Sequence, residues 1–333
     1  MPRDARPLAR LHPPSPFRGD PRLPAPGPAV RAGSDAFVTN NLQRVLFAAV
    51  AIPLALGIVW RGGLALALLV AAVAALGARE LFALAEHTGV RPLRGLGVAL
   101  AVLAPLGVWL LAESWEGGAL GFLEKLAPWL SGQWPLVAAL VPAVVLTAVL
   151  FRRGPGERPL ECAAVTLFGP VYCGVLPSAI LLIRNAAGDH RSWPATWLVF
   201  FPLAVTWLCD SFAMWGGKLI GGARLAPEIS PGKTRAGAVA GLVGGVVTAV
   251  AFVPLALAPV GRAFSLPRAA VMGLLIAGAA QVGDLAESLL KREAGVKDSS
   301  RLIPGHGGVL DRFDSLYFVL PVSALLFRAF GVV

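Results

Sequence analysis

The chain has 333 residues, of which 56% are hydrophobic and only 14% are charged, and its mean hydropathy is +0.71. These values exclude an ordinary water-soluble domain, and the repeated apolar runs of roughly 20 residues predict a polytopic membrane protein. The formal net charge of +10 does not come with any pattern that suggests nucleic-acid recognition. Because helices satisfy their own backbone hydrogen bonds where water is absent, the predicted fold class is all-α, an integral membrane helical bundle.

The first 41 residues differ in composition from the rest. The opening stretch, MPRDARPLARLHPPSPFRGDPRLPAPGPAV, is rich in Pro and Arg and lacks the apolar core of a signal peptide. We predict a disordered cytoplasmic tail over 1–41. Contact of its arginines with an anionic leaflet, at about 1 kcal/mol each, is the alternative reading.

About nine membrane spans are predicted after the tail. Pro170 and Pro177 interrupt the fifth span and are expected to kink or split it, so that eight or ten spans are the alternatives. Nine spans place the two termini on opposite sides of the membrane. The predicted spans are 44–60, 63–84, 94–112, 134–151, 160–182, 194–215, 236–257, 268–290 and 314–330.

The distribution of basic residues predicts the orientation. A cytoplasmic N-terminus places most of the 29 Lys and Arg on the cytoplasmic side, as membrane proteins prefer. The 216–235 loop is then cytoplasmic, and a bacterial inner membrane is the expected location. Two parts follow the tail: N-terminal transmembrane helices over 42–192 and a C-terminal transmembrane region over 193–333, which contains the candidate site residues described next.

Polar residues interrupt the apolar pattern in the eighth span. Asp284, Glu287, Ser288 and Lys291 recur at helical spacing, so they form a polar stripe near the cytoplasmic end. A carboxylate at this depth costs at least about 2.5 kcal/mol unless a cation, water or a partner compensates it. Asp284 is therefore a candidate site residue, and an ion pair with Lys291 that holds helices together is the structural alternative.

The loop that follows this span combines cations, carboxylates and glycines. Such a set suggests a metal-bound phosphate, because magnesium bridges carboxylate and phosphate oxygens while Lys and Arg neutralise the remaining charge. His306 is either a hydrogen-bond donor, a general base or a loop residue satisfied by the backbone. The loop offers Lys297, Arg301 and Arg312 as cations, Asp298, Asp311 and Asp314 as oxygen ligands, and Gly305, Gly307 and Gly308 for close backbone approach.

A second polar patch lies between the sixth and seventh spans. Asp210 stands at the membrane edge, Lys218 follows a glycine pair, and SPGKT places three polar side chains before the seventh helix. A helix N-terminus favours anions, so the patch suggests a phosphate cradle, although the P-loop spacing is absent. An ordinary Gly, Pro and Lys loop is the alternative. The three cysteines show no metal-ligand spacing and are expected to pack in apolar surroundings.

The stretch from Ser288 to Asp314 has the pattern S-x-x-K-R-x4-K-D-x-S-x2-I-P-x-H-G-G-V-x-D-R-F-D. It resembles the signature of the phosphatidate cytidylyltransferase family, also called CDP-diacylglycerol synthases. The similarity extends upstream through the second patch and covers roughly 205–330. The chain departs from the family pattern at Met214, Gly222 and Ala236, the last of which replaces a usual glutamate.

The resemblance implies an all-helical, commonly dimeric membrane enzyme with a polar cavity that faces the cytoplasm. The implied reaction joins CTP and phosphatidate to CDP-diacylglycerol with release of pyrophosphate, and membrane lipids are expected partners. Asp284 and Asp311 are implied to hold a two-metal centre that contains Mg²⁺. The implied catalytic residues are Asp284, Lys297, Asp298, His306, Asp311, Arg312 and Asp314, and the implied CTP or phosphate ligands are Asp210, Lys218, Ser230, Lys233, Thr234, Ser288, Lys291, Arg292, Gly307 and Gly308.

Two other functions stay open at this point. A CTP-dependent kinase of a polyprenol or phytol alcohol would need a general base for a neutral hydroxyl, which makes His306 essential, and would release CDP. A transporter would explain Asp284 and Lys291 inside the membrane, but it would not require the charged loop that follows.

Overall fold

The computed structural model describes residues 52–112, 123–186, 191–303 and 307–333, with side chains from 126 onward in the second range. The chain divides into Met1–Leu46 and Phe47–Val333, and all described residues belong to the second unit. The predicted tail over 1–41 and the loop residue His306 lie outside the described residues.

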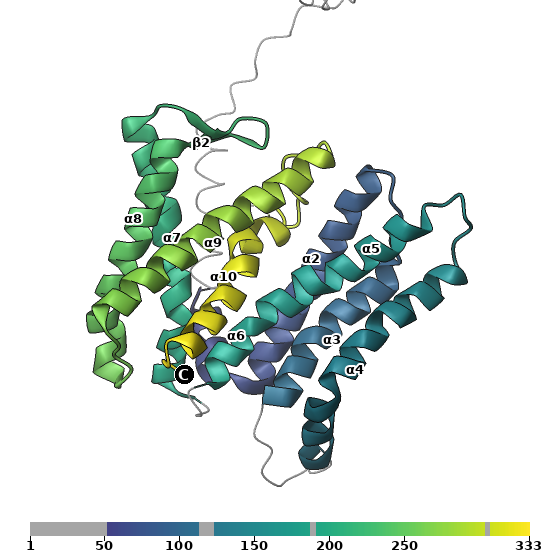
Figure 1. Ribbon diagram of the computed structural model, residues 1–333, viewed down its shortest axis with the longest axis horizontal. Helices are drawn as coiled ribbons and strands as arrows, with labels where there is room; N and C mark the ends of the chain where they lie inside the picture. The colour runs from purple at the N-terminus through teal and green to yellow at the C-terminus, as the bar shows by residue number, and fades with distance from the viewer. Residues whose placement is uncertain (1–51, 113–122, 187–190, 304–306) are drawn as a thin grey trace, which may run out of the picture. The chain divides into compact units, whose positions relative to one another are not determined.

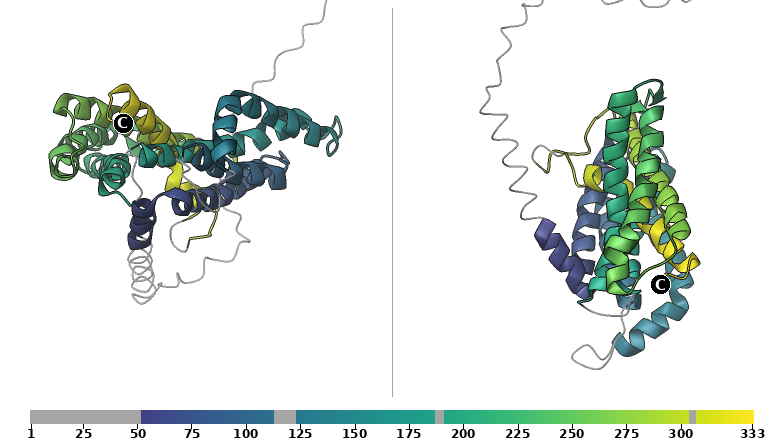
Figure 2. Two further views of the ribbon diagram at one scale, coloured as in Figure 1. Left: turned by 90° about the horizontal axis from the view of Figure 1, so that it is seen from below. Right: turned by 90° about the vertical axis from the view of Figure 1, so that its left-hand side faces the viewer.

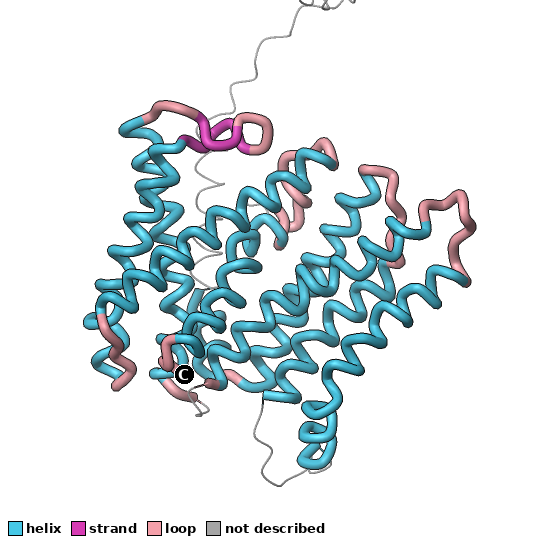
Figure 3. The backbone as a smooth tube through the Cα atoms, in the orientation of Figure 1, coloured by secondary structure: helices cyan, strands magenta, loops and turns pink. Residues whose placement is uncertain are grey.

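Helices form nearly all of the described part of the chain, as predicted from composition (Figures 1 and 3). A helix over Ile52–Arg61 comes first. The following elements are α2 (Gly63–His87), α3 (Arg94–Ala112), α4 (Leu123–Leu150), α5 (Pro159–Gly169), the π-helix η1 (Pro170–Val175), α6 (Leu176–Asn185), α7 (Trp193–Ile220), α8 (Arg235–Phe252), the π-helix η2 (Val253–Leu257), the 3-10 helix η3 (Ala258–Val260), α9 (Leu266–Glu293) and α10 (Leu310–Ala329).

Seven of the described helical segments are long and apolar enough to cross a membrane. The helical membrane fold is thus confirmed, whereas the predicted count of nine is not. The first predicted span, 44–60, is described only from residue 52, as a ten-residue helix. The last, 314–330, falls in α10, which carries three charged residues within its first two turns and is not among the seven.

The predicted break in the fifth span is a π-helical segment. Pro170 begins η1 and Pro177 lies in the first turn of α6, so α5, η1 and α6 form one candidate span over Pro159–Asn185. The wider π turn accommodates prolines, which lack the N–H of a regular helix. A Cβ at Gly174 would lie 2.6 Å from the carbonyl oxygen of Ala101, so this glycine permits close packing of η1 on α3.

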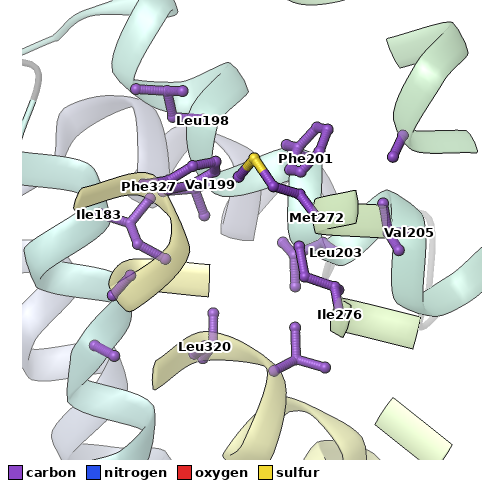
Figure 4. Packing of buried hydrophobic residues seen from close by; sticks show 14 of the residues in the cluster. Ile183, Leu198, Val199, Phe201, Leu203, Val205, Met272, Ile276, Leu320 and Phe327 are labelled. Carbon is purple, nitrogen blue, oxygen red and sulfur yellow. The ribbon is translucent and has the colours of Figure 1, made fainter. Parts of the chain in front are cut away.

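The helices of the C-terminal half share one apolar core. Helices α7, α8 and α9 pack side by side, and α10 packs against both α9 and α6 (Figures 1 and 2). Phe201, Met272 and Phe327 are fully buried where α7, α9 and α10 meet (Figure 4). This packing holds the ends of α7, α9 and α10 in one place, which positions the polar residues found there.

A short hairpin is the one strand pair in the described part of the chain. Strand β1 (Arg224–Ala226) pairs antiparallel with β2 (Ser230–Thr234) between α7 and α8 (Figure 3). Sequence analysis did not predict these strands. The hairpin contains the SPGKT stretch and delivers its last residue to the N-terminus of α8.

Arg184 ties the helix Ile52–Arg61 to the rest of the bundle. Its side chain is 1% exposed, and its guanidinium donates to the carbonyl oxygens of Val59 at 2.8 Å and Trp60 at 2.7 Å. A cation at a helix C-terminus satisfies carbonyls that have no partner within the helix. The burial of Arg184 is therefore explained by the helix C-terminus that it caps.

Replacement of Arg184 by Leu should destabilise the protein, because it removes the hydrogen bonds to the carbonyl oxygens of Val59 and Trp60. The variant leaves two buried carbonyls without donors, which should lower the apparent Tm in detergent by roughly 5 to 10 °C. The exposed Arg152 provides the control, and Arg152→Leu should leave Tm within about 1 °C. An unchanged Tm for Arg184→Leu would contradict this role for the buried arginine.

Candidate active site

A cavity of about 810 Å³ lies where four helices and the hairpin meet. Its walls come from the C-terminal half of α7, the hairpin, the first turn of α8, the C-terminal half of α9 and the first two turns of α10. Eight of the predicted site residues line it: Asp210, Lys218, Lys233, Thr234, Asp284, Asp311, Arg312 and Asp314. The structure therefore brings together the two polar patches that lie far apart in the sequence.

Asp284 has a cation partner on the opposite wall of the cavity. Its Oδ2 lies 2.5 Å from Nζ of Lys233, which projects from the hairpin. Both side chains are about one-third exposed, so the pair is open to the cavity. The predicted alternative, an ion pair of Asp284 with Lys291, is wrong, because Lys291 has other partners.

Lys291 bridges two carboxylates below the cavity. Its Nζ lies 2.9 Å from Oε2 of Glu287 and 2.7 Å from Oδ1 of Asp311. Glu287 is 0% exposed, and its Oε1 has no hydrogen-bond partner among the described residues. A buried carboxylate needs such a cation, because the cost of desolvating an unpaired charge is several kcal/mol. Lys291 thus holds α9 against α10 as well as standing next to the site.

Asp311 is held from both sides. Oδ1 accepts from Lys291, and Oδ2 accepts from the backbone N–H of Ser299 at 2.9 Å, the hydroxyl of Ser299 at 2.8 Å and the N–H of Gly308 at 2.8 Å. Burial raises the pKa of Asp311, but the hydrogen bonds from Lys291, Gly308 and Ser299 outweigh it and lower the pKa below its ordinary value. This carboxylate, in the first turn of α10, is therefore ionised at neutral pH.

Glu80 is a site residue that sequence analysis missed. It lies in α2, is 7% exposed, and accepts hydrogen bonds from the hydroxyls of Ser299 and Ser300 at 3.0 and 2.6 Å. It also accepts from the N–H groups of Val309 and Leu310 at 3.0 and 2.7 Å, so it caps the N-terminus of α10. The sequence signal is a carboxylate inside the predicted span 63–84, which is costly unless it has partners.

Ser299 connects Glu80 to the cavity. Its hydroxyl lies 3.0 Å from Oε2 of Glu80 and 2.8 Å from Oδ2 of Asp311. The loop between α9 and α10 is thus fixed to α2 on one side and to the cavity carboxylate on the other. A helix of the N-terminal half, α2, therefore shapes the site through Glu80.

The remaining predicted site residues do not line the cavity in the described part of the chain. Ser288 lies 3.4 Å from Oδ1 of Asp284, and Gly308 acts through its hydrogen bond to Asp311. Arg292 is exposed and donates to the carbonyl oxygens of Ile229 and Val296. The others, placed on the hairpin or on the loop, are Ser230, Lys297, Asp298 and Gly307.

Thr234 has a structural role in addition to its place in the cavity wall. Its hydroxyl accepts from the N–H of Gly237 at 3.0 Å and caps α8. The cavity residues that were not predicted include Trp207, Arg224 and Gln281, whose amide also donates to the carbonyl oxygen of Ala238.

The cavity has the chemistry of a site for a metal-bound phosphate. Asp210, Asp284 and Asp314 supply hard oxygen ligands on its walls, and Lys218, Lys233 and Arg312 supply cations. No three Asp, Glu, His or Cys side chains among the described residues lie close enough to hold a metal by themselves. Magnesium fits such a partial set, because it is usually bound by one or two carboxylates and completed by water and substrate phosphates.

Comparisons with known proteins agree with this chemistry. A model of the cytidylyltransferase family matches residues 42–330. Phosphatidate cytidylyltransferase 5, chloroplastic, of Arabidopsis thaliana is 33% identical over 301 residues, which cover 83% of this chain and 69% of the relative. Phosphatidate cytidylyltransferase of Synechocystis is 31% identical over 302 residues, 84% of this chain and 94% of the relative. The Brucella abortus protein of that name is 40% identical over 165 residues, 50% of this chain and 56% of the relative.

Replacement of Lys291 by Met should cost about 3 to 5 kcal/mol of stability, because Glu287 and Asp311 lose their shared cation while staying buried. The measurement is the apparent Tm in detergent. Addition of Glu287→Gln to this variant should recover part of the lost stability. The control is Lys297→Met, which replaces an exposed loop lysine and should leave the apparent Tm unchanged. A double variant no more stable than Lys291→Met would disprove the pairing.

Replacement of Glu80 by Gln should loosen the start of α10. The amide cannot accept four donors, so the N–H groups of Val309 and Leu310 should exchange with deuterium about 10- to 100-fold faster. Glu86→Gln, on the same helix but in an exposed pair with Arg94, is the matched control and should leave these amides unchanged. Equal exchange in Glu80→Gln and the parent chain would show that Glu80 does not hold the loop.

Proposed function

The chain belongs to the cytidylyltransferase family, and we propose that it transfers the cytidylyl group of CTP to the phosphate of phosphatidate. The products are CDP-diacylglycerol and pyrophosphate. The observation that carries the proposal is the cavity in which Lys233 and Arg312 face the carboxylates of Asp284 and Asp314. Lys233 precedes α8 and Asp284 lies in the C-terminal half of α9, two helices that are long enough to span a membrane, so a soluble nucleotide and a lipid phosphate can meet at this pair.

The reaction needs positioning and charge neutralisation more than a strong base. An oxygen of the lipid phosphate forms a bond to the α-phosphorus of CTP, and the bond from that phosphorus to pyrophosphate breaks. The attacking phosphate is already an anion, so the barrier lies in bringing two anions together and in stabilising the leaving group. Lys218, Lys233 and Arg312 supply cations for this purpose, and their places on three different walls orient the phosphates between them.

Magnesium is part of the proposal, with Asp284 and Asp311 as the residues that would hold it. When bound, the ion would neutralise phosphate charge and polarise the phosphate oxygens. Asp284 faces the cavity with one oxygen paired to Lys233. In Asp311, Oδ2 already accepts three hydrogen bonds, so an ion would bind at Oδ1, which it would share with Lys291. A second metal ion in this centre is proposed from the resemblance alone, without an identity.

The chain is a multi-pass membrane protein, since seven of its described helical segments have the length and hydropathy of membrane spans. We infer a cytoplasmic N-terminus and a bacterial inner membrane from the distribution of Lys and Arg. This orientation puts the cavity on the side that holds CTP. A homodimer is the proposed assembly, on the resemblance alone.

Asp284→Asn and Asp311→Asn should each lower turnover at least about 100-fold while the protein still folds, because each removes a charge that the transition state needs. The assay combines purified protein, CTP, phosphatidate and Mg²⁺ and measures pyrophosphate and CDP-lipid. Glu228→Gln, on the exposed hairpin turn, is the control. Turnover near that of the parent would remove the substituted residue from the proposed site. Release of CDP in place of pyrophosphate would overturn the cytidylyltransferase reaction itself.

A further inference from the structure

A second cleft lies on the other side of the Glu80–Ser299 contact. It has a volume of about 710 Å³ and is formed by α2, α3 and the loop that follows α9. It shares no lining residue with the cavity described above. We propose that this cleft binds the phosphate headgroup of an anionic membrane lipid, with Arg79 as its principal cation.

Arg79 carries a charge that the protein does not compensate. It lies in α2, a candidate membrane span, about two turns or roughly 12 Å before the helix ends. It lines the cleft, is exposed, and has no hydrogen-bond or ion-pair partner among the described residues. The adjacent carboxylate, Glu80, points to the loop and is occupied there by four donors. An unpaired charged side chain in a membrane span is costly to keep in lipid, so it indicates a binding site for a ligand or a pathway for an ion.

A phosphate is the ligand that suits this charge. Arg94 contributes a second guanidinium to the cleft, although it also pairs with Glu86. Guanidinium groups bind phosphate through two parallel hydrogen bonds, a geometry that favours phosphate over a simple anion. The hydroxyl of Ser300 lines the same cleft, and it donates to Glu80 at 2.6 Å.

The surroundings favour a lipid over a free phosphate. Leu76, Val98 and Leu302 form part of the cleft wall beside the arginines. Beyond the cleft, Leu68 on α2 and Leu103 on α3 are 53% and 59% exposed, which is the character of a surface in contact with acyl chains. A lipid whose phosphate sits at Arg79 would lay its chains along this apolar face.

The cleft adjoins the proposed catalytic cavity through a single residue. Ser299 lines the cleft, and its hydroxyl contacts Glu80 as well as Asp311. A lipid phosphate bound here is therefore next to the loop that fixes Asp311. The lipid is either the substrate of the proposed reaction, in which case this part rests on that function, or a resident anionic lipid that steadies the loop.

The test compares the lipids retained by the purified full chain and by Arg79→Gln, measured by native mass spectrometry in mild detergent. The probes are phosphatidate, phosphatidylglycerol and the zwitterionic phosphatidylcholine. Arg79→Gln should retain at least about fivefold less of the anionic lipid, with phosphatidylcholine unchanged. Arg79→Lys should retain an intermediate amount, and the exposed Arg152→Gln is the matched control that should retain the parent amount.

The pattern of loss identifies the lipid. Loss of phosphatidate alone, with its apparent KM raised at least about fivefold and the KM for CTP unchanged, supports the substrate as the occupant. Loss of phosphatidylglycerol as well supports a resident anionic lipid. Equal retention of both anionic lipids by Arg79→Gln and the parent overturns the proposal. Lipid retention is measured without turnover, so absence of CDP-lipid product from the parent chain would count against the proposed function and not against this site.

Discussion

Every carboxylate buried among apolar helices must have a donor, and the site is organised around this requirement. Glu80, Glu287 and Asp311 come from three helices. Glu80 and Asp311 accept from groups distant in the sequence, and Glu287 accepts from Lys291 on its own helix. Glu80 takes the free N–H groups at the start of α10, while Lys291 joins the other two carboxylates. Since an unpaired buried charge costs several kcal/mol, these contacts fix where α2, α9 and α10 stand relative to one another.

The helical fold and the two polar patches could be predicted because both rest on local patterns. Apolar runs of span length identify α3 with the bounds that the structure has, whereas α7 and α9 extend a few residues beyond their predicted bounds. The predicted span 236–257 corresponds to α8 and the π-helix η2 that continues it. The polar stripe at Asp284 and the charged loop after α9 stand out against an apolar background. That the second patch, which contains Lys233, joins Asp284 in one cavity agrees with the prediction that both lie on the same side of the membrane.

The pairings inside the site could not be predicted, because they depend on packing between helices distant in sequence. Lys291 can reach Asp284, Glu287 or Asp311 by spacing alone, and the structure pairs it with the last two. Glu80 lies 219 residues before Ser299, and no pattern in either segment refers to the other. The hairpin was not predicted for a different reason: its strands are only three and five residues long, and β2 contains Pro and Gly, which local propensity places in turns.

The pairing of charges also bears on how a nucleotide enters a site that is already neutral. Lys233 and Asp284 satisfy each other across the cavity, so a phosphate that took the lysine alone would leave the carboxylate without a partner. A cation that took the carboxylate alone would leave the lysine uncompensated. A phosphate and a divalent cation that arrive together replace both partners at once, and each new contact is charge-assisted. In the proposed reaction, the ion pair would therefore favour entry of the nucleotide together with its metal. By the same argument Arg79, which has no such partner among the described residues, is open to an anion on its own.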